Sequence, residues 1–269
     1  MAPSIVGMRA EALRGRTGRG VSIAVIDSGA HPGHPHLGPL AGGIALMPDG
    51  SEHDDLTDRL GHGTAVTAAI QEKAPGARIH IAGVFHDELA TSARALAKAI
   101  DWAAERGCRV ANLSLGTPRQ SRIEQLQPAV ERAARAGTLV IAAHSHEGQL
   151  QLPGSLPGAL GVCLDWNLPR HSLRIARRDG RRVLCASGYP RPIPGVPPTR
   201  NLNGISFAVA NATGMVALAL ELFCEARGRA DVLAALAAVS CLRGRRAAPA
   251  GGGAGHQVDG VPISGGTGG

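Results

Sequence analysis

The amino-acid sequence predicts an α/β fold with three layers, in which helices cover both faces of a mostly parallel central sheet. Short runs of β-branched and aliphatic residues alternate along the chain with longer segments that have helical periodicity. Such alternation is typical of βαβ units, in which helices join parallel strands. The strand-like runs are apolar at nearly every position, as expected for strands that are covered on both faces.

The predicted elements follow one another in a regular order. The first strand, at 21–26, is a nearly continuous β-branched run that ends at Asp27, and open α/β sheets carry function at such carboxyl ends. The next elements are a helix at 64–70, a strand at 78–85 and a helix at 90–106 that stops at Gly107. They are followed by a strand at 110–116, a helix at 123–136 with a local disturbance at Pro128, and a strand at 138–143.

The last third of the chain has weaker patterns. We expect two shorter strands, at 160–164 and 183–186. Residues 187–203 are rich in Pro and Gly and predict a loop. Two helices follow, a buried one from Ser206 to about residue 226 and another at about 230–242, and the Gly-rich end of the chain is expected to be disordered.

Three short motifs carry the candidate chemistry. They are Val25-Ile26-Asp27-Ser28-Gly29, Gly61-His62-Gly63-Thr64 and Asn203-Gly204-Ile205-Ser206-Phe207-Ala208. A serine hydroxyl is a poor nucleophile unless an imidazole takes its proton and a carboxylate fixes the tautomer of that imidazole. Each motif alone also fits a turn or a helix cap, but together they predict a catalytic triad of Asp27, His62 and Ser206.

The order of the three residues indicates a family. Aspartate, then histidine, then serine is the subtilisin order, and on these motifs the chain resembles the subtilisin-like serine peptidases, or subtilases, from about residue 18 to 240. Further matches are His34-Pro35-His36-Leu37, Ala74-Pro75 and Ser114-Leu115-Gly116. The resemblance implies a subtilisin-like fold and an endopeptidase without a cofactor that forms an acyl-enzyme. In that mechanism Ser206 attacks, His62 acts as base and then acid, and Asp27 orients His62.

The resemblance also assigns the substrate contacts and the oxyanion site. Ser114, Leu115 and Gly116 match the segment to which an extended peptide substrate adds as a strand, and Ser145 is expected beside them. The family has Asn in the position of His146, where the amide donates to the oxyanion, and Thr in the position of Ile205. An imidazole N–H can replace the amide as donor.

These two departures leave three alternatives open. One is a working peptidase that is slow or pH-dependent, the second is a triad-bearing protein that needs an activating protein partner, and the third is a catalytically impaired peptide-binding scaffold protein. Labelling by a serine-directed fluorophosphonate probe would separate the enzyme from the scaffold.

Composition argues against several other classes of protein. The 269-residue chain has a net charge of +7, but its arginines are scattered and aromatic residues make up only 2%, so we expect no nucleic-acid binding. The five cysteines have no zinc-type spacing and are expected to be reduced and mostly buried. Clusters of His and Asp in loops fit solvent-facing positions better than ligands, so we expect no metal. The clustered residues are His31, His34, His36, His144, His146, Asp54, Asp55 and Asp58.

The ends of the chain suggest where it works. We expect no membrane span, since no apolar run approaches the roughly 18 to 20 residues of a transmembrane helix. We also expect no secretory signal in residues 1–9. Only 26 residues precede Asp27, too few for the prodomain of secreted subtilases. We therefore expect an N-terminal extension at 1–17, a peptidase domain at 18–243 and a tail at 244–269. A cytoplasmic processing peptidase, such as one that removes the leader of a precursor peptide, would fit these features.

Overall fold

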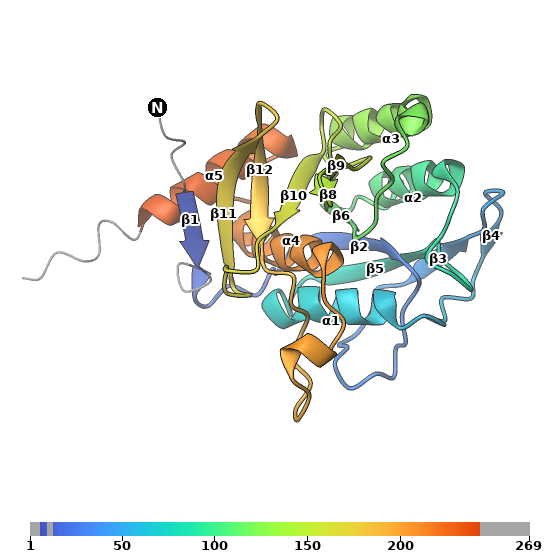
Figure 1. The fold of residues 1–269 in the computed structure, drawn as a ribbon, viewed down its shortest axis with the longest axis horizontal. Helices are drawn as coiled ribbons and strands as arrows, with labels where there is room; N and C mark the ends of the chain where they lie inside the picture. Colours follow the sequence, from blue (N-terminus) through green and yellow to red (C-terminus); the bar gives the residue numbers. More distant parts are fainter. Residues whose placement is uncertain (1–5, 10–12, 243–269) are drawn as a thin grey trace, which may run out of the picture.

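The computed structural model describes residues 6–9 and 13–242, and a ten-stranded sheet forms the middle layer of the fold (Figure 1). The strand order is β1-β11-β12-β10-β7-β6-β2-β5-β3-β4. The strands are β1 (Val6–Arg9), β2 (Ser22–Asp27), β3 (Gly43–Leu46), β4 (Glu52–His53), β5 (Arg78–Gly83), β6 (Val110–Leu113), β7 (Leu139–Ala143), β10 (Leu160–Leu164), β11 (Ser172–Arg178) and β12 (Arg181–Ala186).

The centre of the sheet is parallel, as the sequence predicts. Strands β3, β5, β2, β6, β7, β10 and β12 all pair in parallel, and Ile23 of β2 lies opposite Ile79 and Val110 of its two neighbours. Antiparallel pairing is confined to β1, β11 and β4 near the two ends of the sheet. Parallel strands bring their carboxyl ends to one edge, where Asp27 ends β2.

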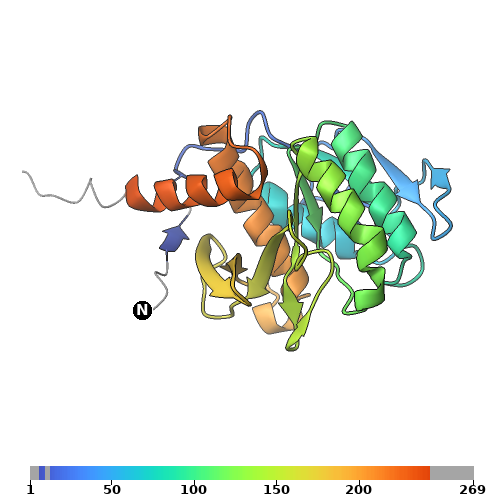
Figure 2. The same cartoon turned by 90° about the horizontal axis from the view of Figure 1, so that it is seen from above.

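Helices cover both faces of the sheet (Figure 2). They are α1 (His62–Lys73), α2 (Ala93–Glu105), α3 (Ile123–Arg135), α4 (Ile205–Leu222) and α5 (Gly228–Leu242). Alternate residues of a strand point to opposite faces, and β2 follows this rule. Ile23 and Val25 pack with residues of α1, α4 and α5, whereas Ala24 and Ile26 pack with residues of α2 and α3.

The central helix α4 corrects one expectation. Ile205–Leu222 is long and apolar enough to span a membrane by length and composition, although we expected no such run. Its residues are buried from Phe207 to Leu220, where they pack against the sheet and against α1. Its hydrophobicity therefore fits the core helix of this fold.

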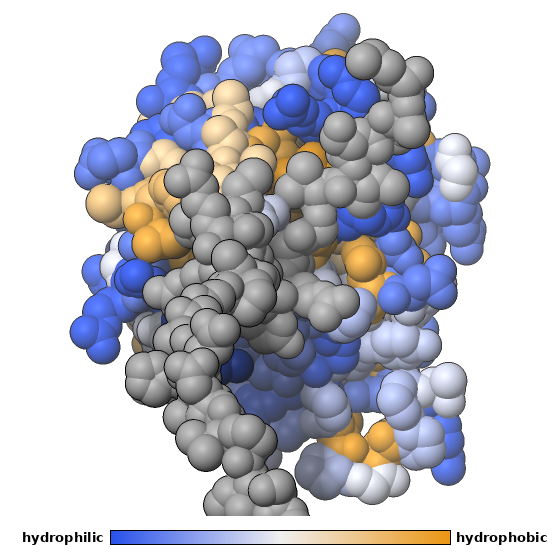
Figure 3. Space-filling view, turned by 90° about the vertical axis from the view of Figure 1, so that its left-hand side faces the viewer, coloured by the Kyte–Doolittle hydropathy of each residue, from blue (hydrophilic) through white to orange (hydrophobic). Residues whose placement is uncertain are grey.

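Several strands have no signal in the sequence. β11 leaves Arg177 and Arg178 exposed. At the end of the molecule that carries β1 and β11, hydrophilic residues surround several hydrophobic patches (Figure 3). β1 lies in the segment predicted to be an extension and pairs with β11. The short β8 (Ser145–His146) and β9 (Gln149–Leu150) form a separate hairpin.

Other expectations concern α3, the cysteines and the tail. α3 runs through Pro128 without a break, so the disturbance expected there does not end the helix. A proline inside a helix removes one backbone hydrogen bond, because it has no N–H to donate. Cys108, Cys163 and Cys185 are buried free thiols, and Cys224 is an exposed one. The predicted Gly-rich tail lies outside the described residues.

A buried lysine beneath α4 is expected to make the free energy of unfolding depend on pH in the alkaline range. The side chain of Lys73 has no exposed surface, and its Nζ lies 3.3 Å from the carbonyl oxygen of Ala69 and 3.1 Å from Oε2 of Glu72, which also pairs with Arg170. Burial lowers the pKa of Lys73 from 10.5 to about 8. The folded state therefore disfavours the charged form, and stability increases as pH rises from about 8 to about 10.5.

We predict that Lys73→Met removes this dependence. The wild-type free energy of unfolding should gain up to about 3 kcal/mol across that pH window relative to the variant, since each unit of pKa shift corresponds to about 1.4 kcal/mol. At pH 7 the variant should be at least as stable as the wild type, because it no longer buries a charge. Urea unfolding of both proteins from pH 7 to 10.5 measures the difference, and parallel pH curves would contradict it.

Candidate catalytic site

Asp27 and His62 meet at the carboxyl edge of the sheet. Asp27 ends β2 with a fully buried side chain, and His62 begins α1. Nδ1 of His62 lies 2.7 Å from Oδ1 of Asp27, which also accepts the backbone N–H of Ser28 at 2.8 Å. Since the aspartate is the acceptor, this contact fixes the proton on Nδ1 and leaves Nε2 of His62 free to act as a base.

The environment of His62 adjusts its basicity. Burial by itself lowers the pKa of His62, but the hydrogen bond and charge of Asp27 and the charge of Asp58 outweigh it, so the pKa is raised. A raised pKa makes the imidazole a stronger base, and it also extends the acidic range in which His62 is protonated and unable to accept a proton.

Asp58 is a site residue that the sequence did not reveal. We expected a charged loop position, but Asp58 is half-buried and its carboxylate accepts five hydrogen bonds. Oδ1 accepts the hydroxyl of Ser28 and the backbone N–H groups of Leu60 and Gly61, and Oδ2 accepts the N–H and hydroxyl of Thr64. Burial raises the pKa of Asp58, but these hydrogen bonds lower it more. Asp58 therefore ties the turn after Asp27 to the start of α1.

We predict that Asp58→Asn shifts the pH profile of activity. An amide has one acceptor oxygen where the carboxylate has two, so some donors lose their partner and stability should fall by about 1–3 kcal/mol. Loss of the charge lowers the pKa of His62, which moves the acid limb of the kcat/KM profile to lower pH. Asp55→Asn, at an exposed position in the same loop, is the control and should leave the profile unchanged. An unshifted limb in Asp58→Asn would refute this role.

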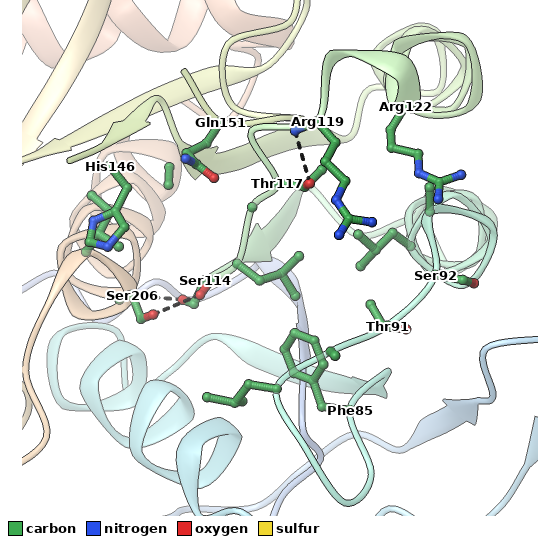
Figure 4. A pocket seen from close by; sticks show the side chains of 18 of the residues that line it. Phe85, Thr91, Ser92, Ser114, Thr117, Arg119, Arg122, His146, Gln151 and Ser206 are labelled. Carbon is green, nitrogen blue, oxygen red and sulfur yellow. Dashed lines mark hydrogen bonds between the residues drawn. The ribbon is translucent and has the colours of Figure 1, made fainter. Parts of the chain in front are cut away.

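Ser206 lies in the first turn of α4 and lines the same cleft as His62. Its Oγ donates to the carbonyl oxygen of Ser114 at 2.9 Å, while Oγ of Ser114 donates to the carbonyl oxygen of Ser206 at 2.9 Å (Figure 4). Asn112 and Thr213 extend this network into the core, with distances of 3.0 Å from Asn112 Nδ2 to Ser114 Oγ and 2.9 Å from Thr213 Oγ1 to Asn112 Oδ1. The network joins the start of α4 to the end of β6.

The hydroxyl of Ser206 is hydrogen-bonded to the carbonyl of Ser114. Within the described residues its hydrogen bond goes to Ser114, and none joins it to His62. Both side chains nevertheless line the same cleft. A hydroxyl released from Ser114 could rotate about the Cα–Cβ bond within this shared cleft.

The predicted substrate contacts lie along this cleft, except one. The cleft has a volume of about 630 Å³, and its lining includes Ser114, Leu115 and Gly116. Ser145, by contrast, lines a second pocket, where its Oγ lies 3.9 Å from Sγ of Cys163. The side chain of Ser145 therefore lies in a second pocket, which shares His146 with the cleft.

Gln151 is a second residue that sequence reasoning missed. Gln151 is buried and lines the cleft beside Gly116. The two residues are so close that a Cβ atom added to Gly116 would lie 2.9 Å from Cβ of Gln151. The backbones of Thr117 and Leu152 exchange two hydrogen bonds, at 3.0 and 2.9 Å, which hold this wall of the cleft against the substrate segment. Gln151 therefore places a polar amide on the cleft wall.

The predicted oxyanion donor lies near the nucleophile. His146 lines the cleft together with Ser206, and half of its side chain is exposed (Figure 4). Ile205, the first residue of α4, also lines the cleft and offers no hydroxyl. The N–H groups in the first turn of a helix have no partner within the helix, so the Ser206 amide can point at an anion.

The histidine and aspartate clusters show no metal-site geometry. In the part of the chain that the structure describes, no group of three or more His, Cys, Asp or Glu side chains could hold a metal ion. Nε2 of His144 lies 3.0 Å from Oδ2 of Asp179 instead. The carboxylate of Asp58 is occupied by protein donors.

Comparison with known proteins identifies relatives of this arrangement. The model of the subtilase family matches residues 18–166. Subtilisin Savinase of Lederbergia lenta is 32% identical over 217 residues, which are 76% of this chain and 78% of that protein. M-protease of Shouchella clausii (strain KSM-K16) is also 32% identical over 217 residues, and there the match spans only 55% of the relative's length.

A solved structure shares the fold. The prenylagaramide maturation protease PagA superposes with a TM-score of 0.59 at 27% identity, and the match covers 80% of each chain. These comparisons agree with a mostly parallel sheet between two layers of helices.

Proposed function

Because this chain belongs to the subtilase family, we propose that it is a serine endopeptidase that cleaves peptide bonds through an acyl-enzyme. The observation that carries the proposal is the placement of Asp27, His62 and Ser206, with the 2.7 Å contact between His62 and Asp27 at the edge of a cleft that Ser206 also lines.

The geometry suggests how the reaction would proceed. Ser206 leaves the carbonyl of Ser114, gives its proton to Nε2 of His62 and attacks the carbonyl carbon of the substrate. The backbone N–H of Ser206 and the imidazole of His146 donate to the oxyanion. His62 then protonates the leaving amine, and water releases the acyl group from Ser206 by the same steps.

Substrate binding would support the first step. When an extended peptide adds as a strand to residues 114–117, its N–H groups compete for the backbone carbonyls of that segment. The carbonyl of Ser114 then exchanges its bond from the nucleophile for one from the substrate. Binding of the substrate would thus release the hydroxyl of Ser206 for rotation toward His62.

A fluorophosphonate probe tests the proposal directly. We expect it to label the wild-type protein at Ser206 and to leave Ser206→Ala unlabelled, because labelling requires an activated hydroxyl. Thermal unfolding of both proteins checks that the variant is folded. No labelling of the folded wild type at any pH from 6 to 9 would contradict the proposal.

We also propose a narrow processing role inside the cell, such as removal of the leader of a precursor peptide. Its support is the likeness to PagA, which is described as a maturation protease, and the polar side chain of Gln151 in a cleft of limited volume. A peptide library derived from digested proteins measures the breadth of cleavage, and cell fractionation locates the protein. Unselective cleavage or a secreted protein would argue against this role.

The alternative is a peptide-binding protein that turns over substrate only with an activating partner. It is favoured by the orientation of the Ser206 hydroxyl toward Ser114 and by the absence of the usual asparagine at position 146. Labelling by the probe only after addition of a cell extract would support this alternative over an independent enzyme.

A further inference from the structure

Two arginines stand at one end of the cleft. Arg119 and Arg122 follow the substrate segment in the chain, and both line the cleft together with Leu115 and Thr117 (Figure 4). Arg119 is exposed and Arg122 is partly buried at the start of α3. Their guanidinium groups therefore face the space that an extended peptide would occupy.

Neither guanidinium group has a carboxylate partner among the described residues. Nη1 of Arg122 contacts only the amide oxygen of Gln125, at 3.4 Å. The backbone N–H of Arg119 donates to Oγ1 of Thr117, but among the described residues its guanidinium group makes no hydrogen bond. Arg132, further along α3, differs because it pairs with both carboxylate oxygens of Asp101 at 2.9 and 2.7 Å. Two unpaired cations close together repel each other unless an anion lies between them.

The rest of the cleft contains nothing that would neutralise them. Its lining is made of small, apolar and hydroxyl-bearing residues together with His62, His146 and Gln151, and it includes no aspartate or glutamate. Cleft walls of one sign of charge concentrate the field on a bound ligand. A peptide carboxylate in this region would meet two donors with a geometry suited to bidentate contacts.

We infer that this cleft selects peptides with an acidic side chain on the N-terminal side of the scissile bond, bound by Arg119 and Arg122. The inference rests on the proposed peptidase function, because that function fixes where the bond lies. Leu115 and Gly116 are the expected contacts of the residue before the cut, and the arginines lie beyond them along the same segment. An extended chain advances about 3.3 Å per residue, and the arginines lie past the contacts of the residue before the cut. The acidic residue is therefore expected further from the cut, and the positions to test are roughly two to five residues before it.

The test compares matched peptides that carry glutamate or glutamine at each of these positions in turn. At one position glutamate should raise kcat/KM about tenfold, mainly through KM, as expected for a pair of charge-assisted contacts in a partly exposed site. Raising the ionic strength from about 0.02 to about 0.5 M should reduce this preference. In Arg119→Glu/Arg122→Glu the preference should reverse in favour of lysine at the same position.

Arg135→Glu is the matched control, because Arg135 is exposed and lies at the far end of α3, roughly 20 Å from Arg122. It should keep the preference for glutamate. Fluorophosphonate labelling of all variants separates damage to the catalytic residues from loss of selectivity. Equal kcat/KM for glutamate and glutamine at every position would overturn the inference while leaving the peptidase function intact.

A binding measurement makes the inference independent of turnover. The Ser206→Ala protein should bind the fluorescent glutamate peptide about tenfold more tightly than the glutamine peptide, as measured by fluorescence polarisation. If the wild type is neither labelled nor active, the peptidase proposal fails, and this measurement still decides whether the arginines bind an acidic peptide. Equal affinities would then overturn the inference.

Discussion

Replacing His62 with alanine is expected to lower kcat by about 10⁶, the size of the loss that removal of the equivalent residue causes in subtilisin, from which we take the figure. Without the imidazole the Ser206 hydroxyl has no acceptor for its proton except the carbonyl of Ser114, which is no base. The leaving amine also loses its proton donor. Rates of peptide cleavage and of fluorophosphonate labelling should fall together.

Two further variants give this prediction its internal controls. Asp27→Ala should cost less, about 10⁴ in kcat, since it removes the orientation and charge stabilisation of the imidazole but leaves the base in place. The double variant His62→Ala/Ser206→Ala should be no slower than either single variant, because the residues act as a unit. A loss of less than about 10² for His62→Ala would mean that another group takes the proton of Ser206.

The sequence predicted those parts of the fold whose pattern is set by local rules. Strands β2, β5, β6 and β7 are buried at nearly every position and mostly apolar because both faces are covered, and this makes them visible as runs in the sequence. The three chemical motifs lie where such strands end or where helices begin, so the fold alone brings them to one edge. The residues of the triad could therefore be assigned before their distances were known.

Features that depend on contacts across the fold were not predictable. β11 has exposed arginines and β1 is only four residues long, so neither strand has a periodic apolar pattern in the sequence. Each is recognised as a strand only through its pairing with its neighbours in the sheet. Asp58 resembled its exposed neighbours in the sequence, and only the folded loop turns its carboxylate toward Ser28 and Thr64. The position of Ser145 followed the family pattern, but the β8–β9 hairpin directs that side chain into the second pocket.

The oxyanion site is the part of the catalytic apparatus in which this chain differs from its family. His146 stands on β8 beside the cleft, and its Nε2 lies 3.8 Å from Oε1 of Glu147, a contact too long for a hydrogen bond. The imidazole is therefore not held by Glu147 and can donate toward an anion bound at Ser206. Ile205 contributes no second donor, so the site would depend on His146 and one backbone N–H.

His146→Ala is accordingly expected to lower kcat by about 10² to 10³ with little change in KM, because the donor acts on the oxyanion and not on the bound substrate. This is the loss of roughly 2.7–4 kcal/mol measured when a subtilisin loses its asparagine donor. His146→Asn should retain most of the activity, since its amide can donate to the same oxygen. His53→Ala, at an exposed position on β4, should behave as the wild type.

Ile205→Thr, which adds a hydroxyl at the start of α4, should raise kcat in the His146→Ala background. Unchanged kcat in His146→Ala would remove the imidazole from the mechanism and leave the Ser206 amide as the donor.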